Sequence, residues 1–176
     1  MQEQELVGFA AYWAKWGTLT VTAGIAFVTA AIGGIATDVG PWYKRLRQPA
    51  LKPPDWAFGP AWTTIFTLIA IATARVWDAA PPDLKLWVLL VFGLNALLNA
   101  AWSVFYFTLK RPDLALIEVV LFWCSIVAMV GLSFYILPGA GWLLLPYLVW
   151  VSFAAWLNWQ TVRLNPPFGK PDVAHG

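Results

Sequence analysis

The sequence is poor in residues that bind metals or form disulfides. Its 176 residues include one cysteine, Cys124, and one histidine, His175. A single cysteine cannot form an intramolecular disulfide, and zinc sites need several cysteine, histidine or carboxylate ligands. We therefore expect no disulfide, no metal site and no required cofactor.

Charge and catalytic motifs are equally scarce. Only 11% of the residues are charged, against about 25% in typical soluble domains. The net charge of +2 comes without a run of Lys and Arg, so we expect no nucleic-acid partner. The chain shows no Ser-His-Asp set, no paired carboxylates in an apolar segment and no phosphate-binding glycine loop. These absences favour a binding or sensing protein over a conventional enzyme.

Long apolar stretches dominate instead. Hydrophobic residues make up 60% of the chain, and several charge-free stretches are long enough to cross a bilayer. A transmembrane helix needs about 20 apolar residues, and an open sheet leaves backbone groups unpaired in lipid. The longest stretch is cut in two where helix-breaking residues cluster at 138–141. A soluble bundle of buried helices is the alternative, but its helices should show polar faces.

We therefore predict an all-α integral membrane protein, a bundle of five transmembrane helices with a structured Pro/Trp-rich loop between the first two. A single domain (16–164) should follow an N-terminal interfacial tail (1–15) and precede a C-terminal cytoplasmic tail (165–176). The predicted spans cover about residues 16–37, 56–75, 86–109, 113–137 and 141–163.

The distribution of Lys and Arg predicts the orientation in the membrane. With five spans the termini lie on opposite sides, and the positive-inside rule places the more basic side in the cytoplasm. We expect the N-terminus outside and the C-terminus cytoplasmic, in a bacterial cell membrane. The side of the C-terminus carries Lys44, Arg45, Arg47, Lys52, Lys110, Arg111, Arg163 and Lys170, and the other side carries Lys15, Arg75 and Lys85.

The 13 tryptophans divide by depth. Most lie near the ends of predicted spans, as expected for an interfacial aromatic belt. An indole N–H deep in hydrocarbon is costly without a partner, so each deeper tryptophan needs a protein acceptor or a ligand. The deeper ones are Trp62, Trp102, Trp123, Trp150 and Trp156.

Polar residues are spaced to share helix faces. Asn95, Asn99 and Ser103 follow one another at intervals of four, which places them on one face of the third span. Interhelical hydrogen bonds explain such a stripe as well as a ligand site does. Glu118 is the one acid well inside a span. We expect it to bond a polar group on a neighbouring helix, with a functional acid as the alternative.

The loop between the first two spans carries the most specific pattern. Its segment WYKRLRQPALKPPDWAFGPAWTTIF resembles the signature of the TspO/MBR family, the tryptophan-rich sensory proteins and peripheral-type benzodiazepine receptors. Two later blocks, LNAAWSVFYF and LLPYLVWVSFAAWLN, agree with it, although Gln48 stands where the family usually has lysine. The signature positions that match are Trp42, Tyr43, Leu46, Pro49, Pro53, Pro54, Trp56, Phe58, Pro60, Trp62 and Thr63.

The resemblance implies a five-helix membrane protein, commonly a homodimer, that binds porphyrins such as protoporphyrin IX. In some members it implies binding of cholesterol or benzodiazepine-type synthetic ligands. Trp62 and Trp150 match positions that contact ligands, and they are the catalytic candidates if a bound porphyrin is photo-oxidised. The full ligand-binding set that the resemblance implies is Tyr43, Trp62, Phe66, Asn95, Asn99, Trp102, Tyr147, Trp150 and Ala154.

The same loop should form a stiff lid over that cavity, because proline fixes φ and removes a backbone donor. Its basic residues either meet the two propionates of a porphyrin or anchor the loop to anionic lipid. The residues expected in the lid are Trp42, Lys44, Arg45, Arg47, Pro53 and Pro54.

We therefore expect a tetrapyrrole-binding sensor or regulator of porphyrin metabolism or of a stress response. A light-dependent porphyrin-degrading catalyst and a transporter of porphyrin or sterol-like lipophiles are the alternatives. A transporter should show inverted repeats or broken helices with midplane charges, and five unlike spans with one acid do not. Trp159 occupies the tyrosine position of the family's C-terminal cholesterol pattern, which disfavours sterol recognition.

Overall fold

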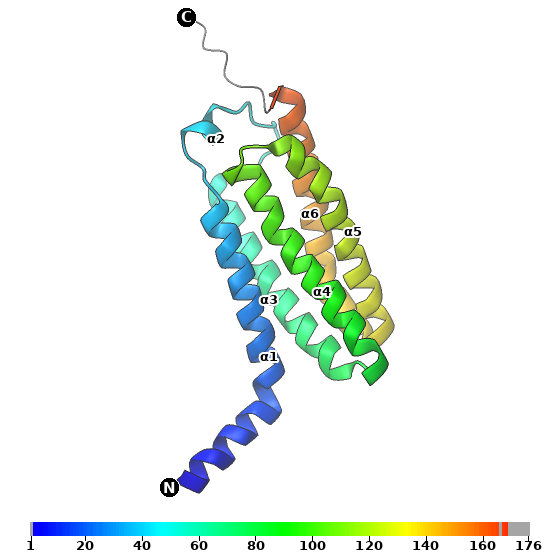
Figure 1. The fold of residues 1–176 in the computed structure, drawn as a ribbon. Helices are drawn as coiled ribbons and strands as arrows, with labels where there is room; N and C mark the ends of the chain where they lie inside the picture. Colours follow the sequence, from blue (N-terminus) through cyan, green and yellow to red (C-terminus); the bar gives the residue numbers. More distant parts are fainter. Residues whose placement is uncertain (1, 166, 169–176) are drawn as a thin grey trace, which may run out of the picture.

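The computed structural model describes residues 2–165 and 167–168, and in this part of the chain all regular structure is helical (Figure 1). Within it, five helices are long and apolar enough to cross a membrane. A π-helical turn, η1 (Val104–Thr108), extends the third of them, and a short helix, α2 (Pro41–Arg45), interrupts the lid. The predicted fold class is confirmed. The five long helices are α1 (Gln2–Ala36), α3 (Asp55–Ala79), α4 (Pro82–Ser103), α5 (Pro112–Ile136) and α6 (Pro138–Leu164).

The first helix starts earlier than the first predicted span. α1 runs back to Gln2, through most of the segment predicted as an interfacial tail, 1–15. Residues 7–16 are exposed, and the helix first becomes buried at Gly17. No proline lies in this segment, so nothing stops the helix from continuing beyond the bundle. The predicted C-terminal tail, 165–176, lies almost entirely outside the described residues.

Proline marks the start of most helices. At the first helical position the missing N–H would be unpaired anyway, and the fixed φ of proline suits the helix. Four helices begin in this way, at Pro41, Pro82, Pro112 and Pro138.

The break between the last two spans is shorter than the sequence suggested. α5 ends at Ile136 and α6 begins at Pro138, so Leu137 alone lies between them. Gly141 permits the close approach of the two helices, because a Cβ at this position would come within 2.6 Å of the Phe134 ring. The residues that were predicted to break the helix therefore form its first turn.

The five long helices close into a ring. α1 packs against α3 and α4, α3 packs against α6, and α5 packs against both α4 and α6. Side chains from α3 to α6 fill the core, with Val88, Phe122, Ile126 and Leu144 almost fully buried. Figure 1 shows the first turns of α1 leaning away from the other helices, and α2 at the same end of the bundle as the end of α6.

The outer faces of the helices are apolar as well. Ile117, Val120 and Leu121 of α5 are exposed, and so are Leu94 and Leu97 of α4. Soluble monomers rarely expose large contiguous apolar patches, whereas lipid tails accommodate them. The helices thus bury one apolar face against each other and present a second one outward.

Asn158 connects α6 to the first turn of α5. Its side chain is almost fully buried, with the amide oriented so that Nδ2 donates to the Pro112 carbonyl at 3.0 Å and Oδ1 accepts from the Leu116 N–H at 3.1 Å. The Pro112 carbonyl and the Leu116 N–H are four residues apart, the spacing of an ordinary helical hydrogen bond, so α5 itself can pair them. Asn158 adds two hydrogen bonds to the same groups from a neighbouring helix.

We predict that Asn158→Leu lowers the free energy of unfolding by about 1–3 kcal/mol, because two buried hydrogen bonds between α6 and α5 are lost. The measurement is reversible denaturation of the purified protein in detergent. Gln160→Ala, on the same helix, is the control and should stay within about 0.5 kcal/mol of the wild type. Equal stability of Asn158→Leu and the wild type would contradict this role.

Candidate functional site

A cavity of about 500 Å³ lies inside the ring of helices. All five long helices contribute to its walls, and α1 supplies one complete side. Its size falls within the range of about 300–1,000 Å³ that is typical of small-molecule sites. Four residues of the ligand-binding set expected from the sequence line it: Phe66, Asn95, Asn99 and Tyr147.

A chain of hydrogen bonds forms one wall of this cavity. Asn99 Nδ2 donates to the Tyr147 hydroxyl at 3.0 Å, and that hydroxyl donates to Asn95 Oδ1 at 3.1 Å. Asn95 Nδ2 then donates to Ser125 Oγ at 2.8 Å, and Ser125 donates to the Phe122 carbonyl at 2.6 Å. The chain runs through α4, α6 and α5, so the polar stripe predicted on the third span is an interhelical network that also borders the cavity.

The cavity is uncharged and offers few free donors. None of the described residues that line it carries a formal charge. The hydroxyls of Thr22, Thr29 and Thr73 donate to backbone carbonyls, at 2.9, 2.9 and 2.7 Å. An apolar or neutral group with N–H or O–H donors therefore suits this space better than an anion.

The α1 wall was missed by the sequence reasoning. Thr18, Thr22 and Thr29 line the cavity from α1, and Thr18 also donates to Asp78 Oδ1 at 2.7 Å. Their spacing of four and then seven residues places them on one face of a helix. That periodicity was the available signal.

A second, smaller pocket of about 60 Å³ lies beneath the lid. Lid residues Tyr43, Gln48, Pro49 and Lys52 line it together with residues from α3, α4, η1 and α6. Among the latter are Trp102 and Ala154, so the lid pocket holds three members of the expected ligand-binding set, Tyr43 included.

The remaining two members, Trp62 and Trp150, line neither cavity. They contact each other edge to face, with ring centroids 6.4 Å apart. Trp62 also contacts Tyr147 of the large cavity at 6.4 Å, and Trp150 contacts Phe58 of the lid pocket at 5.7 Å. The two indoles therefore form an aromatic layer that joins residues of the large cavity to residues of the lid pocket.

The deep tryptophans differ in how their N–H groups are paired. Trp123 Nε1 donates to Ser152 Oγ at 2.8 Å. Trp102 Nε1 and Trp150 Nε1 are buried without a partner among the described residues. Because a buried unpaired donor is costly, these two indoles are the ones that a ligand acceptor would satisfy.

The sequence expectation for Glu118 is wrong. Its side chain is 8% exposed, yet neither carboxyl oxygen has a hydrogen-bond partner among the described residues. Glu118 is absent from the linings of both cavities. The asparagine side chains of α4 and α6 and the Tyr147 hydroxyl are already bonded to one another, to Ser125 and to α5 backbone.

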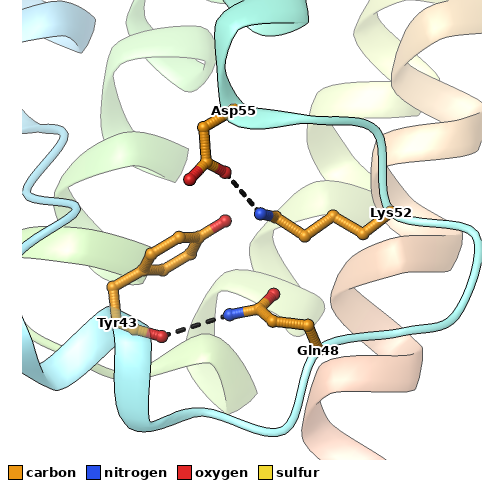
Figure 2. A network of polar contacts seen from close by, with 4 residues as sticks. All are labelled: Tyr43, Gln48, Lys52 and Asp55. Carbon is orange, nitrogen blue, oxygen red and sulfur yellow. Dashed lines mark hydrogen bonds and ion pairs between the residues drawn. The ribbon is translucent and has the colours of Figure 1, made fainter.

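The lid is seated on the bundle by Tyr43. This residue is buried and forms an aromatic cluster with Tyr106 and Phe107, with a centroid distance of 5.7 Å to the latter. Figure 2 shows Lys52 and Gln48 on either side of Tyr43. Gln48 Nε2 donates to the Tyr43 carbonyl at 3.1 Å, Lys52 forms an ion pair with Asp55, and its ammonium lies 5.2 Å from the Tyr43 ring centroid.

These contacts set the charges of the lid at neutral pH. Burial raises the pKa of the Tyr43 hydroxyl above its ordinary value, and Lys52 offsets only part of this effect. Burial alone would lower the pKa of Lys52, but its interactions with Asp55 and Tyr43 outweigh burial and raise it. Lys52 is therefore a cation and Tyr43 a neutral phenol.

The other basic residues of the lid lie elsewhere. Lys44, Arg45 and Arg47 are exposed and belong to the lining of neither cavity. Their predicted contact with ligand carboxylates stays a prediction. Trp42 packs against the aromatic cluster under the lid, and Pro53 and Pro54 lead directly into α3.

Asn165 fastens the lid to the end of α6. Its Oδ1 accepts from the Arg47 N–H at 2.7 Å, and its Nδ2 donates to the Arg47 carbonyl at 2.9 Å. Nδ2 also donates to the Thr161 carbonyl at 2.9 Å, which fixes the side chain on the helix. No motif in the sequence indicated this contact, because it joins residues that are far apart in the chain.

The chain matches the TspO/MBR family over residues 9–164. It is 33% identical over 152 residues to a tryptophan-rich protein TspO from Chlorobaculum tepidum, covering 85% of this chain and 96% of that protein. It is 32% identical over 150 residues to protein CrtK from Rhodobacter capsulatus, covering 85% and 94%. It is 31% identical over 128 residues to a translocator protein from Sus scrofa, covering 70% and 75%.

We predict that Asn165→Ala loosens the lid, because both hydrogen bonds to the Arg47 backbone are lost. Amide hydrogen exchange at residues 42–48 should accelerate by about tenfold, which corresponds to a loss of about 1.4 kcal/mol in local opening. Exchange in α5 should not change. Asn165→Asp keeps the acceptor and should give an intermediate rate. Unchanged lid exchange in Asn165→Ala would show that Tyr43 alone holds the lid.

Proposed function

Because the chain belongs to the TspO/MBR family of integral membrane proteins, we propose that it binds a tetrapyrrole of the protoporphyrin IX type. In this proposal it acts as a sensor or regulator of porphyrin metabolism or of a stress response. The observation that carries the proposal is the uncharged cavity of about 500 Å³ inside the helix ring. No cofactor is needed for such a role.

The chemistry of a porphyrin suits this cavity. Its ring is a large, flat, apolar surface with N–H groups at the centre and two carboxylates on one edge. Apolar walls favour the ring through burial of its surface, and the aromatic side chains Phe66, Phe92 and Trp77 in the lining offer flat contacts. The Asn99–Tyr147–Asn95 hydrogen bonds hold the polar part of the wall in one arrangement, which lowers the entropy cost of binding.

Light-dependent degradation of the bound porphyrin is the second candidate function. The contact between Trp62 and Trp150, with centroids 6.4 Å apart, favours it, because indoles beside a photosensitiser are readily oxidised. These two residues would then be the oxidisable groups, and no acid–base machinery is required.

Sterol-like molecules and benzodiazepine-type synthetic ligands are further ligands that the same apolar cavity would suit. A homodimer is also part of the proposal, because the outward faces of the helices are apolar and a second copy would cover part of them.

The first test is titration of the purified protein with protoporphyrin IX in the dark, followed by illumination. Saturable quenching of tryptophan fluorescence is the result expected for binding. We predict that Trp62→Phe and Trp150→Phe each weaken this binding by up to about tenfold, because they support the cavity wall through the contacts of Trp62 with Tyr147 and with Trp150. Their melting temperatures should stay close to that of the wild type, since the phenyl ring keeps most of the bulk.

Trp123→Phe is the matched control, because Trp123 bonds Ser152 and lies on the exposed surface. Its affinity should equal that of the wild type. Slower bleaching in light with retained affinity, in either Trp62→Phe or Trp150→Phe, would favour the degradation role. Wild-type binding and wild-type bleaching in both variants would exclude these residues from the site, and absent binding to the wild type would overturn the proposed function.

The orientation in the membrane belongs to the same proposal. The lid and the end of α6 share one end of the bundle (Figure 1), and the basic residues of both favour the cytoplasmic side. We predict that a reporter fused after Gly176 is active in the cytoplasm, and that one fused before Met1 is active outside. The reverse pattern would place the lid on the outer face of the membrane.

A further inference from the structure

Lys52 is the one cation, among the described residues, that lines either cavity. From the sequence, Lys44, Arg45 and Arg47 were expected in the lid, and Lys52 was not among the residues singled out. The fold turns Lys52 under the lid, where its side chain is 15% exposed, while the side chain of its partner Asp55 is 57% exposed. The positive charge is therefore held at the pocket, and the compensating negative charge lies toward solvent.

Other groups around the pocket also suit an anion. Trp102 lines it, and its buried indole N–H has no partner among the described residues. Tyr106 lines it from η1, and a phenol can donate to a carboxylate. A carboxylate would provide the acceptor that the Trp102 N–H lacks, and charge-assisted hydrogen bonds are the stronger kind.

We propose that the lid pocket is a carboxylate subsite in which Lys52 binds an acid group of a lipophilic ligand whose apolar body occupies the large cavity. The proposal rests on the proposed function, and it assigns one end of the ligand to a specific residue. Lys52 would then make the protein bind carboxylic acids more tightly than their esters or neutral lipophiles.

The dimensions of the two spaces agree with this division. The lid pocket, at about 60 Å³, is larger than the roughly 10–15 Å³ that one water requires, but it is far too small for an aromatic macrocycle. Asn99 of the large cavity and Trp102 of the lid pocket are three residues apart on α4. At a rise of about 1.5 Å per residue, the two residues lie within one turn of each other, so the two spaces border neighbouring positions of α4.

Asp55 leads to a second expectation, opposite in sign to the one for Lys52. In the unliganded protein Lys52 is paired with Asp55, so a ligand carboxylate must compete with that carboxylate for the ammonium. Removing the charge of Asp55 should therefore strengthen acid binding, whereas removing the charge of Lys52 should weaken it.

The experiment measures dissociation constants in nanodiscs of zwitterionic lipid, for protoporphyrin IX and for its dimethyl ester. Lys52→Gln should weaken binding of the diacid by about tenfold, which corresponds to about 1.4 kcal/mol. The affinity for the ester should change by less than about twofold. Lys52→Arg should restore most of the difference. Asp55→Asn should tighten the diacid several-fold and leave the ester unchanged.

Lys110→Gln is the matched control, since it removes one positive charge at the same end of the bundle from a residue that lines neither cavity. It should change neither constant. Equal effects of Lys52→Gln on acid and ester, or no effect on either, would overturn the proposal.

A second probe pair, pyrenebutyric acid and its methyl ester, separates this inference from the proposed function. The pair carries a flat apolar ring and one carboxylate arm. If the wild type binds no porphyrin, the proposed function fails, and a Lys52-dependent preference for pyrenebutyric acid still supports the carboxylate subsite. Loss of that preference as well would overturn the subsite.

Discussion

The interior of the protein depends on the requirement that every polar group buried in hydrocarbon finds a partner. The hydrogen bonds from Asn99 to Tyr147, from Tyr147 to Asn95 and from Asn95 to Ser125 meet it for these four side chains, whereas Glu118, Trp102 and Trp150 have no partner among the described residues. The hydrogen bonds fasten α4, α5 and α6 together and fix the orientation of Tyr147. The cavity lies on the other side of this wall, where α1 contributes small and hydroxyl-bearing side chains such as Gly17, Thr22 and Ala26.

The lid is held by different interactions, because it lies beyond the apolar faces of the helices. Tyr43 seats it on aromatic side chains, and Asn165 ties its backbone to α6. The segment that follows these attachments, with Gln48, Pro49 and Lys52, encloses a pocket that contains one cation, Lys52. The molecule thus separates an uncharged space inside the helix ring from a charged one beneath the lid, and each space suits a different part of an amphiphilic ligand.

Much of the fold could be predicted from the sequence because the bilayer restricts the choices. Charged residues cannot lie inside a span without cost, so the gaps between charges outline the helices, although three helices start before the predicted positions 86, 113 and 141, at Pro82, Pro112 and Pro138. The N-terminal extension of α1 and the single-residue break at Leu137 were not predicted. Both depend on backbone geometry, since proline and glycine can begin a helix as readily as interrupt one.

The residues of the candidate site were likewise only partly predictable from the sequence. The spacing of four residues identified Asn95 and Asn99, because residues on one helix face share an environment, and the family resemblance identified Tyr147. By itself, then, the sequence determined the spans, the family and the residue types available for binding. The tertiary structure alone decided that Lys52 rather than Arg45 lies under the lid, that Trp123 is paired while Trp102 is not, and that Asn165 holds Arg47. The reason is that side-chain direction in a loop, and contact between distant helices, follow from packing and not from any repeat in the chain.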